Sequence, residues 1–364
     1  MSKKELSKNV NRDSKYELVK ILAVIMIVFS HVANQSEINA YAFSFESIFK
    51  AFSVYLGQIG NGIFVISSCY FLSKKTSIEK WLNLYFQTLF YSLVFLALFA
   101  LFEPKAINSK VIIKSFLPIA FANNWFISAY LLFVPIVPFL NIVHQNTSLK
   151  QFGYLTLGFS MLYVVAPTVI GNRYFASPLF GFVATYLIVV LLRDLNISKN
   201  INISSSVLKI CITLGTVLVL FFIIIVNFLG QYFPLFYGKT FFWQFYYCVP
   251  LMVVNLAIFE LTRRSKSWNN RIINSIASSS LGIYLVHNNI LIVECHKFSS
   301  WFACLDCFSI VPRYVLTTLL VFGGSLFVEK ARQSFLEPIQ SIIVTSLINK
   351  VLHPIARRIE RHLV

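Results

Sequence analysis

Charged residues are scarce in this chain. Asp, Glu, Lys and Arg together make up only 12% of its 364 residues, whereas a soluble domain carries about a quarter. Hydrophobic residues make up 57%, and Phe alone occurs 37 times. A composition so poor in charge argues against a soluble globular protein and describes one whose main solvent is lipid.

Acidic residues are the scarcer kind of charge. The 14 Asp and Glu stand against 31 Lys and Arg, so the formal net charge is +17. On a soluble protein this excess would suggest nucleic acid. On a membrane protein it is explained by cytoplasmic loops that face anionic lipid, so we expect membrane lipids, and no nucleic acid, as partners.

Paired cysteine motifs are missing as well. A zinc site would need a second pair to match the single C-x-x-C of "CLDC", so we predict no metal site. Ordinary cysteines in or beside membrane helices explain the six positions best, and a disulfide among the last three stays open if their loop faces an oxidising space. The six are Cys69, Cys211, Cys248, Cys295, Cys304 and Cys307.

Long apolar runs are abundant, and they predict an all-α, polytopic membrane protein. A span needs about 20 apolar residues to cross about 30 Å of hydrocarbon. Ten runs qualify, near 17–35, 51–73, 81–102, 124–143, 153–171, 175–192, 207–229, 240–262, 272–294 and 309–328. The run at 111–122 is too short to span, which favours a re-entrant or interfacial piece.

The Lys and Arg residues orient these spans. With the N-terminus inside, the inner segments hold 23 of the 31 basic residues and the outer segments hold 8. Positively charged loops face the cytoplasm. We therefore expect both termini to be cytoplasmic, with the first run a retained membrane helix rather than a cleaved signal peptide.

Three segments follow from this layout. Residues 1–15 form a basic cytoplasmic tail, residues 16–330 form the transmembrane domain, and residues 331–364 form a basic, weakly amphipathic tail. We expect the last segment to lie on the inner leaflet. Neither an internal repeat nor an inserted soluble domain is visible.

Ionisable residues inside the spans are few, and they are candidates for function because each is costly in lipid. Lys20 begins the first span near the inner face and His31 lies eleven residues further on. This is about 16 Å along a helix and close to three full turns, so the two side chains share a face. His287 lies at a depth similar to that of His31. A snorkelling lysine and an interfacial anchoring histidine are the alternative interpretations of Lys20 and His287.

The stretch "YELVKILAVIMIVFSHVANQ" resembles the first helix of the membrane acyltransferase family 3. In that family the first helix carries a basic residue, usually arginine, and then a histidine, with ten residues between the two. Lys20 and His31 occupy these two positions. Lysine keeps the positive charge of arginine but lacks its two-pronged hydrogen bonding to phosphate or carboxylate.

Three further stretches are similar to the same family. They are "GNGIFVISSCYFLSKK", in which Cys69 stands where glycine is usual, "NNWFISAYLLFVPIVPFLN" and "SSSLGIYLVHNNIL". The matching residues are Gly60, Phe64, Ser68 and Tyr70, then Trp125, Phe126, Tyr130 and Pro138, and finally Ser280, Gly282, Tyr284, Leu285 and His287. The order and spacing of the four stretches fit the short form of the family, which lacks an extra extracytoplasmic domain.

The resemblance implies an O-acyltransferase of the bacterial plasma membrane that acts on surface polysaccharide or its lipid-linked precursor. It implies no resident cofactor, since acetyl-CoA or another acyl-CoA is the donor substrate. His31 would be the catalytic residue, as a general base or as a covalent acyl carrier. Lys20, Lys74 and Lys75 would bind the donor phosphates. The remaining candidates would line or support the cavity: Ser68, Tyr70, Trp125, Tyr284 and His287.

Two other functions compete with acyl transfer. A transporter or flippase of lipid-linked sugars would also have ten to twelve spans and a basic inner face, although no inverted repeat supports it. A polysaccharide polymerase usually has a large outer loop, and no outer loop here exceeds about twenty residues by these span limits.

Overall fold

A computed structural model describes residues 12–35, 44–73, 77–170, 176–199, 203–236, 243, 245–294, 304–305 and 309–355. Within these residues the chain is helical and contains no strand. Eight helical stretches are long and apolar enough to cross a membrane: Ser14–Asn34, Phe45–Leu72, Ile78–Phe102, Trp125–Gln145, Leu149–Ile170, Pro178–Ile197, Ser205–Tyr232 and Ile310–Phe335. They coincide with eight of the ten predicted spans, so the all-α, multi-pass architecture is confirmed.

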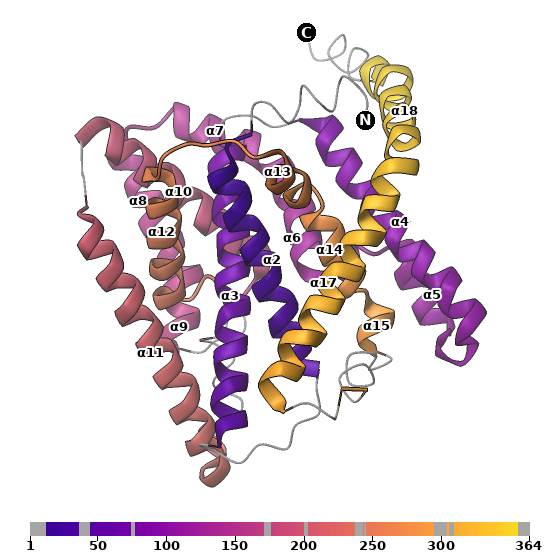
Figure 1. Ribbon diagram of the computed structural model, residues 1–364. Coiled ribbons are helices and arrows are strands. Elements are labelled where there is room, and N and C mark those ends of the chain that lie inside the picture. Colours follow the sequence, from indigo (N-terminus) through magenta and orange to yellow (C-terminus); the bar gives the residue numbers. More distant parts are fainter. Residues whose placement is uncertain are drawn as a thin grey trace.

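These eight stretches correspond to the labelled helices of Figure 1. Six of the stretches are single helices, of which α2 and α10 extend one or two residues beyond the spanning stretch. The other two carry one irregular turn each, because prolines follow α6 and a π-helical turn, Met161–Val165, follows α8. The bounds are α2 (Ser14–Gln35), α3 (Phe45–Leu72), α4 (Ile78–Phe102), α6 (Trp125–Phe133) with α7 (Val137–Gln145), α8 (Leu149–Ser160) with α9 (Ala166–Ile170), α10 (Pro178–Lys199), α11 (Ser205–Tyr232) and α17 (Ile310–Phe335).

The other two predicted spans are not continuous helices. In the run 240–262 the helix α12 (Val249–Arg264) starts only at Val249, where Pro250 occupies the first turn. The run 272–294 is divided into α13 (Arg271–Ala277), α14 (Ser280–His287) and α15 (Ile290–Glu294). Serines and asparagines stand at its two breaks, and their side chains compete for backbone hydrogen bonds. Interrupted backbone at membrane depth is tolerated where protein or a cavity covers it.

The helices α11, α12, α3, α2 and α17 lie side by side across the view of Figure 1, and each contacts the next. The tightest pair is α2 with α3. A Cβ added to Gly60 of α3 would lie 2.5 Å from the carbonyl oxygen of Ala23 in α2. Only glycine permits this separation, and small residues are the usual means of close helix packing in membranes.

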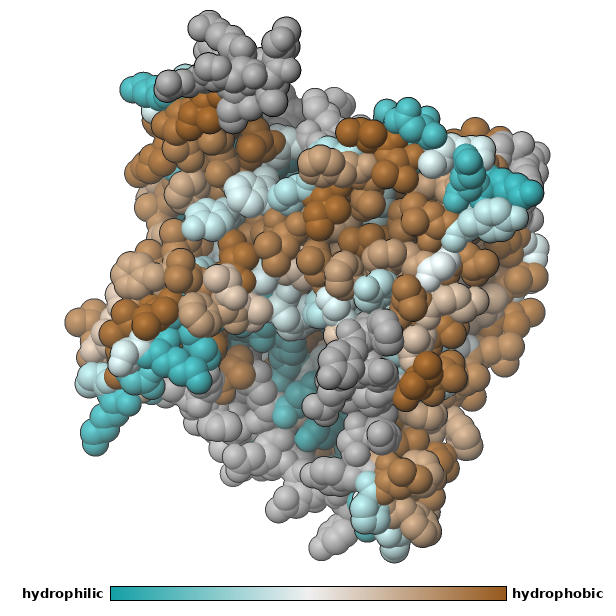
Figure 2. Space-filling model, turned by 180° about the vertical axis from the view of Figure 1, so that it is seen from behind, coloured by the Kyte–Doolittle hydropathy of each residue, from teal (hydrophilic) through white to brown (hydrophobic). Residues whose placement is uncertain are grey.

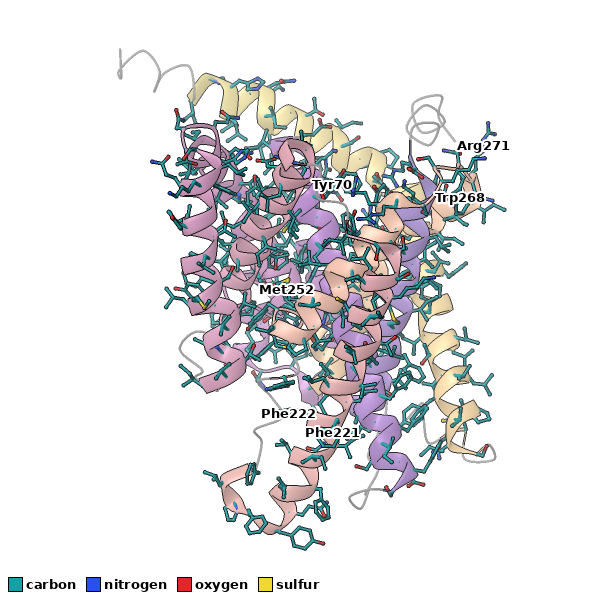
Figure 3. All side chains as sticks on the ribbon, turned by 90° about the vertical axis from the view of Figure 1, so that its left-hand side faces the viewer. Tyr70, Phe221, Phe222, Met252, Trp268 and Arg271 are labelled. Atoms are coloured by element: carbon teal, nitrogen blue, oxygen red, sulfur yellow. The ribbon has the colours of Figure 1, made fainter. Side chains whose placement is uncertain are left out.

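Polar contacts tie the start of α2 to α13 and to the chain before it. The Ser14 hydroxyl lies 2.8 Å from Asn274 Oδ1, and the Lys15 ammonium donates to the carbonyl oxygens of Arg263 and Ser265 at 2.9 Å. Figure 3 shows Trp268, Arg271 and Tyr70 at this end of the bundle, with Met252 near the middle and Phe221 and Phe222 further down. We take this end as cytoplasmic because basic residues gather there.

Two elements lie outside the spanning bundle. The short helix α5 (Ser109–Phe116) occupies the run that is too short to span. Its main packing partner among the described helices is α4. The helix α18 (Glu337–Leu347) follows α17 at the cytoplasmic end and packs on α4 through Val344. The helix α17 continues to Phe335 and so passes through the predicted boundary at residue 330.

Candidate active site

Two histidines from distant parts of the chain meet in the outer half of the bundle. His31 near the end of α2 and His287 at the end of α14 are 256 positions apart, yet His31 Nδ1 lies 3.0 Å from His287 Nε2. His287 is 1% exposed, whereas His31 is partly exposed. Tyr284 packs edge-on against His287, with ring centroids 5.9 Å apart. The pair therefore presents only His31 to any substrate.

The backbone determines where the protons of this pair lie. His287 Nδ1 is 2.6 Å from the carbonyl oxygen of Ile283, and a carbonyl oxygen can only accept, so Nδ1 carries the hydrogen. In the neutral ring Nε2 is then an acceptor, and it accepts from His31 Nδ1. His31 Nε2 is left with a free lone pair, as a general base or nucleophile requires.

A cavity of about 620 Å³ runs from the cytoplasmic end of the bundle toward these histidines. Its mouth is formed by residues of α2, α4 and the chain between α13 and α14. Its walls come from α2, α3, α6 and α14. The described lining residues that lie furthest from the mouth include Ile27, Asn61, Phe126 and Tyr284. Ile27 and Tyr284 each lie one helical turn before a histidine, so the cavity stops one turn short of the pair.

Charges of both signs surround the mouth, with cations in excess. The lining cations are Arg12, Lys20 and Lys80, and the lining anions are Asp13 and Glu17. The Lys20 ammonium lies 3.3 Å from Glu17 Oε1. A net positive mouth attracts an anionic ligand.

The pKa of Asp13 lies below its ordinary value. Burial opposes ionisation, but hydrogen bonds from the Ser267 hydroxyl and from the backbone N–H groups of Lys15 and Trp268 outweigh it. The carboxylate therefore stays charged at neutral pH and holds the chain before α13 to the start of α2.

Further inside, the cavity wall is apolar apart from a few small polar groups. Asn61 is 5% exposed and has one long contact, 3.5 Å from its Nδ2 to Gln58 Oε1. Ser280 is also 5% exposed, and its hydroxyl has no hydrogen-bond partner in the structure. Buried polar groups normally have partners, so these side chains are suited to bind a polar ligand within the cavity.

The structure brings some predicted site residues together and places others elsewhere. Lys20, Ser68 and Tyr284 line the cavity. Tyr70 lies outside the lining, against Tyr16, Phe71 and Phe259 at the cytoplasmic end. Trp125 also lies outside it, stacked on Tyr246 with ring centroids 6.2 Å apart. Lys74, Lys75, Cys295 and Cys307 lie outside the described residues.

Several lining residues did not stand out as site residues in the sequence. Arg12 precedes the first span and Lys80 precedes the third, so both were visible only as part of the inner positive charge. Asn61 and Ser280 fall inside or beside the matched stretches "GNGIFVISSCYFLSKK" and "SSSLGIYLVHNNIL". Small polar residues are common in membrane helices as packing groups, so composition does not single them out.

The fold and the site define a multi-pass membrane protein with a histidine pair one helical turn beyond the inner part of a cavity, whose mouth lies at the basic end of the bundle. A family model described as an acyltransferase domain matches residues 13–330, nearly the whole chain. The chain belongs to acyltransferase family 3 and is a membrane acyltransferase. No curated protein and no solved structure matches it.

Proposed function

We propose that this protein transfers an acyl group, most simply acetyl, from acyl-CoA to a hydroxyl of a cell-surface polysaccharide or its lipid-linked precursor in the bacterial plasma membrane. The observation that carries the proposal is the cavity that leads from a basic cytoplasmic mouth to one turn short of the His31–His287 pair. Membership of the acyltransferase family supports the class of reaction.

The cavity suits the two ends of coenzyme A. The nucleotide end carries phosphates, for which Arg12, Lys20 and Lys80 are suitable cations at the mouth. The pantetheine arm is narrow and carries amide groups, for which Asn61 and Ser280 offer polar partners along an apolar wall. Lys20 and His31 are about 16 Å apart along α2, so phosphate and thioester would bind at opposite ends of one channel.

His31 supplies the base in the reaction. Its Nε2 removes the proton from the acceptor hydroxyl as the hydroxyl oxygen attacks the thioester carbon. The new C–O bond forms, the C–S bond breaks, and the proton passes from His31 to the coenzyme A thiolate. His287 keeps the His31 ring in the correct tautomer by accepting from Nδ1. A covalent acyl-His31 intermediate uses the same nitrogen, and the same products result.

The experiment has a chemical part and a glycan part. Membranes that contain the protein are supplied with acetyl-CoA, and the release of free thiol is compared with that of His31→Ala membranes. In parallel, surface glycans of cells with and without the protein are compared by mass and NMR analysis. We expect thiol release that depends on His31 and O-acetyl groups that are lost without the protein. Glycans that keep their acetyl groups but no longer reach the surface would identify a flippase instead.

A further inference from the structure

Three aromatic rings meet in the wall of the inner part of the cavity. They are Phe64 from α3, Phe126 from α6 and Tyr284 from α14, and all three belong to the cavity lining. The ring centroids of Phe64 and Phe126 are 6.1 Å apart, and those of Phe126 and Tyr284 are 5.7 Å apart, both edge-on. We call these three residues the aromatic layer.

The aromatic layer separates the cavity from the histidine pair. Ile27 lines the cavity four residues before His31, and Tyr284 lines it three residues before His287. Residues at these spacings lie on the same helix face, one turn apart. Among the described residues, neither histidine belongs to the cavity lining. His31 nevertheless keeps partial exposure.

The rear face of the molecule is hydrophilic at its lower centre. Figure 2 shows recessed hydrophilic residues in the lower half of this face, beneath a largely apolar upper half. The lower half is the end away from the basic cytoplasmic mouth. The aromatic layer thus lies between a cytoplasmic cavity and the outward side of the bundle, at the level where an acyl group must pass to reach His31.

The aromatic layer is supported from several directions. Phe126 also contacts Trp125 and Phe182, with centroid separations of 5.7 and 5.6 Å. Tyr284 is 5% exposed, and its hydroxyl accepts from Asn288 Nδ2 at 3.2 Å. A ring held by packing on several helices is displaced only at a cost, because protein interiors are close-packed.

We propose that Phe64, Phe126 and Tyr284 select the acyl group by chain length. This inference rests on the proposed acyl-CoA donor. A two-carbon acyl group on the thioester needs little space beyond the layer, whereas each further methylene has to displace a ring. Discrimination by a packed apolar site is about 10- to 200-fold per methylene group. The layer then makes the enzyme specific for short acyl groups, and its removal admits longer ones.

The test compares Phe126→Ala and Phe64→Ala with Phe71→Ala, which removes an aromatic ring from the mouth of the same cavity. Membranes with equal amounts of each variant receive acetyl-, butanoyl- or hexanoyl-CoA, and thiol release is measured relative to His31→Ala membranes. We expect the hexanoyl-to-acetyl rate ratio to rise at least about tenfold in the two layer variants. In the mouth variant we expect all donors to be affected alike.

The outcomes separate the two proposals. Wild-type thiol release equal to that of His31→Ala with every acyl-CoA would remove the proposed function itself. Wild-type activity with acetyl-CoA, but an unchanged chain-length ratio in both layer variants, would overturn the inference and leave the function standing. If either alanine variant fails to accumulate, Phe126→Leu and Phe64→Leu retain most of the packing and are expected to shift the ratio in the same direction.

Discussion

Two buried polar clusters in this bundle differ in how completely they are satisfied. In the inner half, the carboxylate of Glu329 on α17 is 0% exposed. It accepts from Arg332 Nε and Nη2 at 2.8 and 2.9 Å, from the Tyr91 hydroxyl at 2.5 Å, from Gln87 Nε2 at 3.1 Å and from Gln333 Nε2 at 2.9 Å. A Cβ added to Gly282 of α14 would lie 2.1 Å from Glu329 Cδ, so the helix that carries His287 rests on this carboxylate.

In the outer half, the histidine pair makes two hydrogen bonds to the described part of the chain, from His31 to His287 and from His287 to the Ile283 carbonyl. One nitrogen, Nε2 of His31, is left over on the partly exposed ring. A saturated cluster can hold helices together but has no group to offer a substrate. The comparison therefore indicates that Glu329 holds the helices together and that His31 is the group available to a substrate.

The largest effect on the rate of acyl transfer is expected from removal of the His31 imidazole, whose Nε2 is the proposed base. His31→Ala should lower acyl transfer by about 10²- to 10⁴-fold, the range for loss of a general base, while protein amount and thermal stability stay normal. Thiol release from acetyl-CoA in membranes measures this. A variant that keeps full transfer at the normal protein level would contradict the role of His31.

Removal of the buried Glu329 carboxylate should lower the stability of the folded protein. Glu329→Ala leaves the Arg332 guanidinium, 7% exposed, without its partner inside the bundle. Breaking a buried ion pair in this way costs about 3–5 kcal/mol. We expect a lower unfolding temperature in detergent and a lower protein amount in membranes. The chain-length ratio and pH profile of the remaining folded enzyme should not change, and a shift in either would give Glu329 a part in the chemistry.

Replacement of the supporting histidine should have a smaller effect than either of these changes. His287→Ala removes the acceptor for His31 Nδ1–H and should lower the turnover number about 10- to 100-fold, as for other hydrogen bonds that orient a histidine. His287→Gln restores an acceptor and should recover part of this loss. The pH dependence of the rate is the decisive measurement, because a purely structural change at His287 would not move it.

The smallest effect is expected at the mouth of the cavity. Lys20 is bonded to Glu17 and is partly exposed, so its contribution is that of a screened point charge. Lys20→Ala should raise the KM for acetyl-CoA several-fold, on the scale of one exposed ion pair, with little change in turnover number. Lys20→Arg keeps the charge and should behave as the wild type. Equal losses in both variants would assign Lys20 to packing instead of donor binding.

Much of the architecture was predictable because hydropathy is a local property. Eight spans were located within a few residues of the helices, since a run of apolar residues has to be as long as the membrane is thick. The two interrupted passes were not predicted, because their apolar runs are equally long. The serines at 278–280 and the asparagines at 288–289 mark the breaks of the second, but such residues also occur inside unbroken membrane helices.

The candidate site was predictable in part. The spacing of Lys20 and His31 placed both on one face of a helix, and the structure has Lys20 lining the cavity and His31 one turn beyond its end. Tyr70 was expected to line or support the cavity, and it lies outside the lining, packed against the lining residues Tyr16 and Phe71. Ser68 and Tyr70 are two positions apart, which is more than half a turn of helix, so both cannot face the same space.

The sequence by itself determined the membrane class, the approximate helix lengths and the relative depth of the two histidines, and it predicts that the basic segments face inward. Each of these follows from composition or from helical periodicity within one segment. Only the tertiary structure decided that His31 meets His287 across 256 positions, that Glu329 supports Gly282, and that Phe64, Phe126 and Tyr284 meet in the cavity wall. Such contacts depend on how each helix is rotated against its neighbours, and in lipid no apolar stripe reports that rotation.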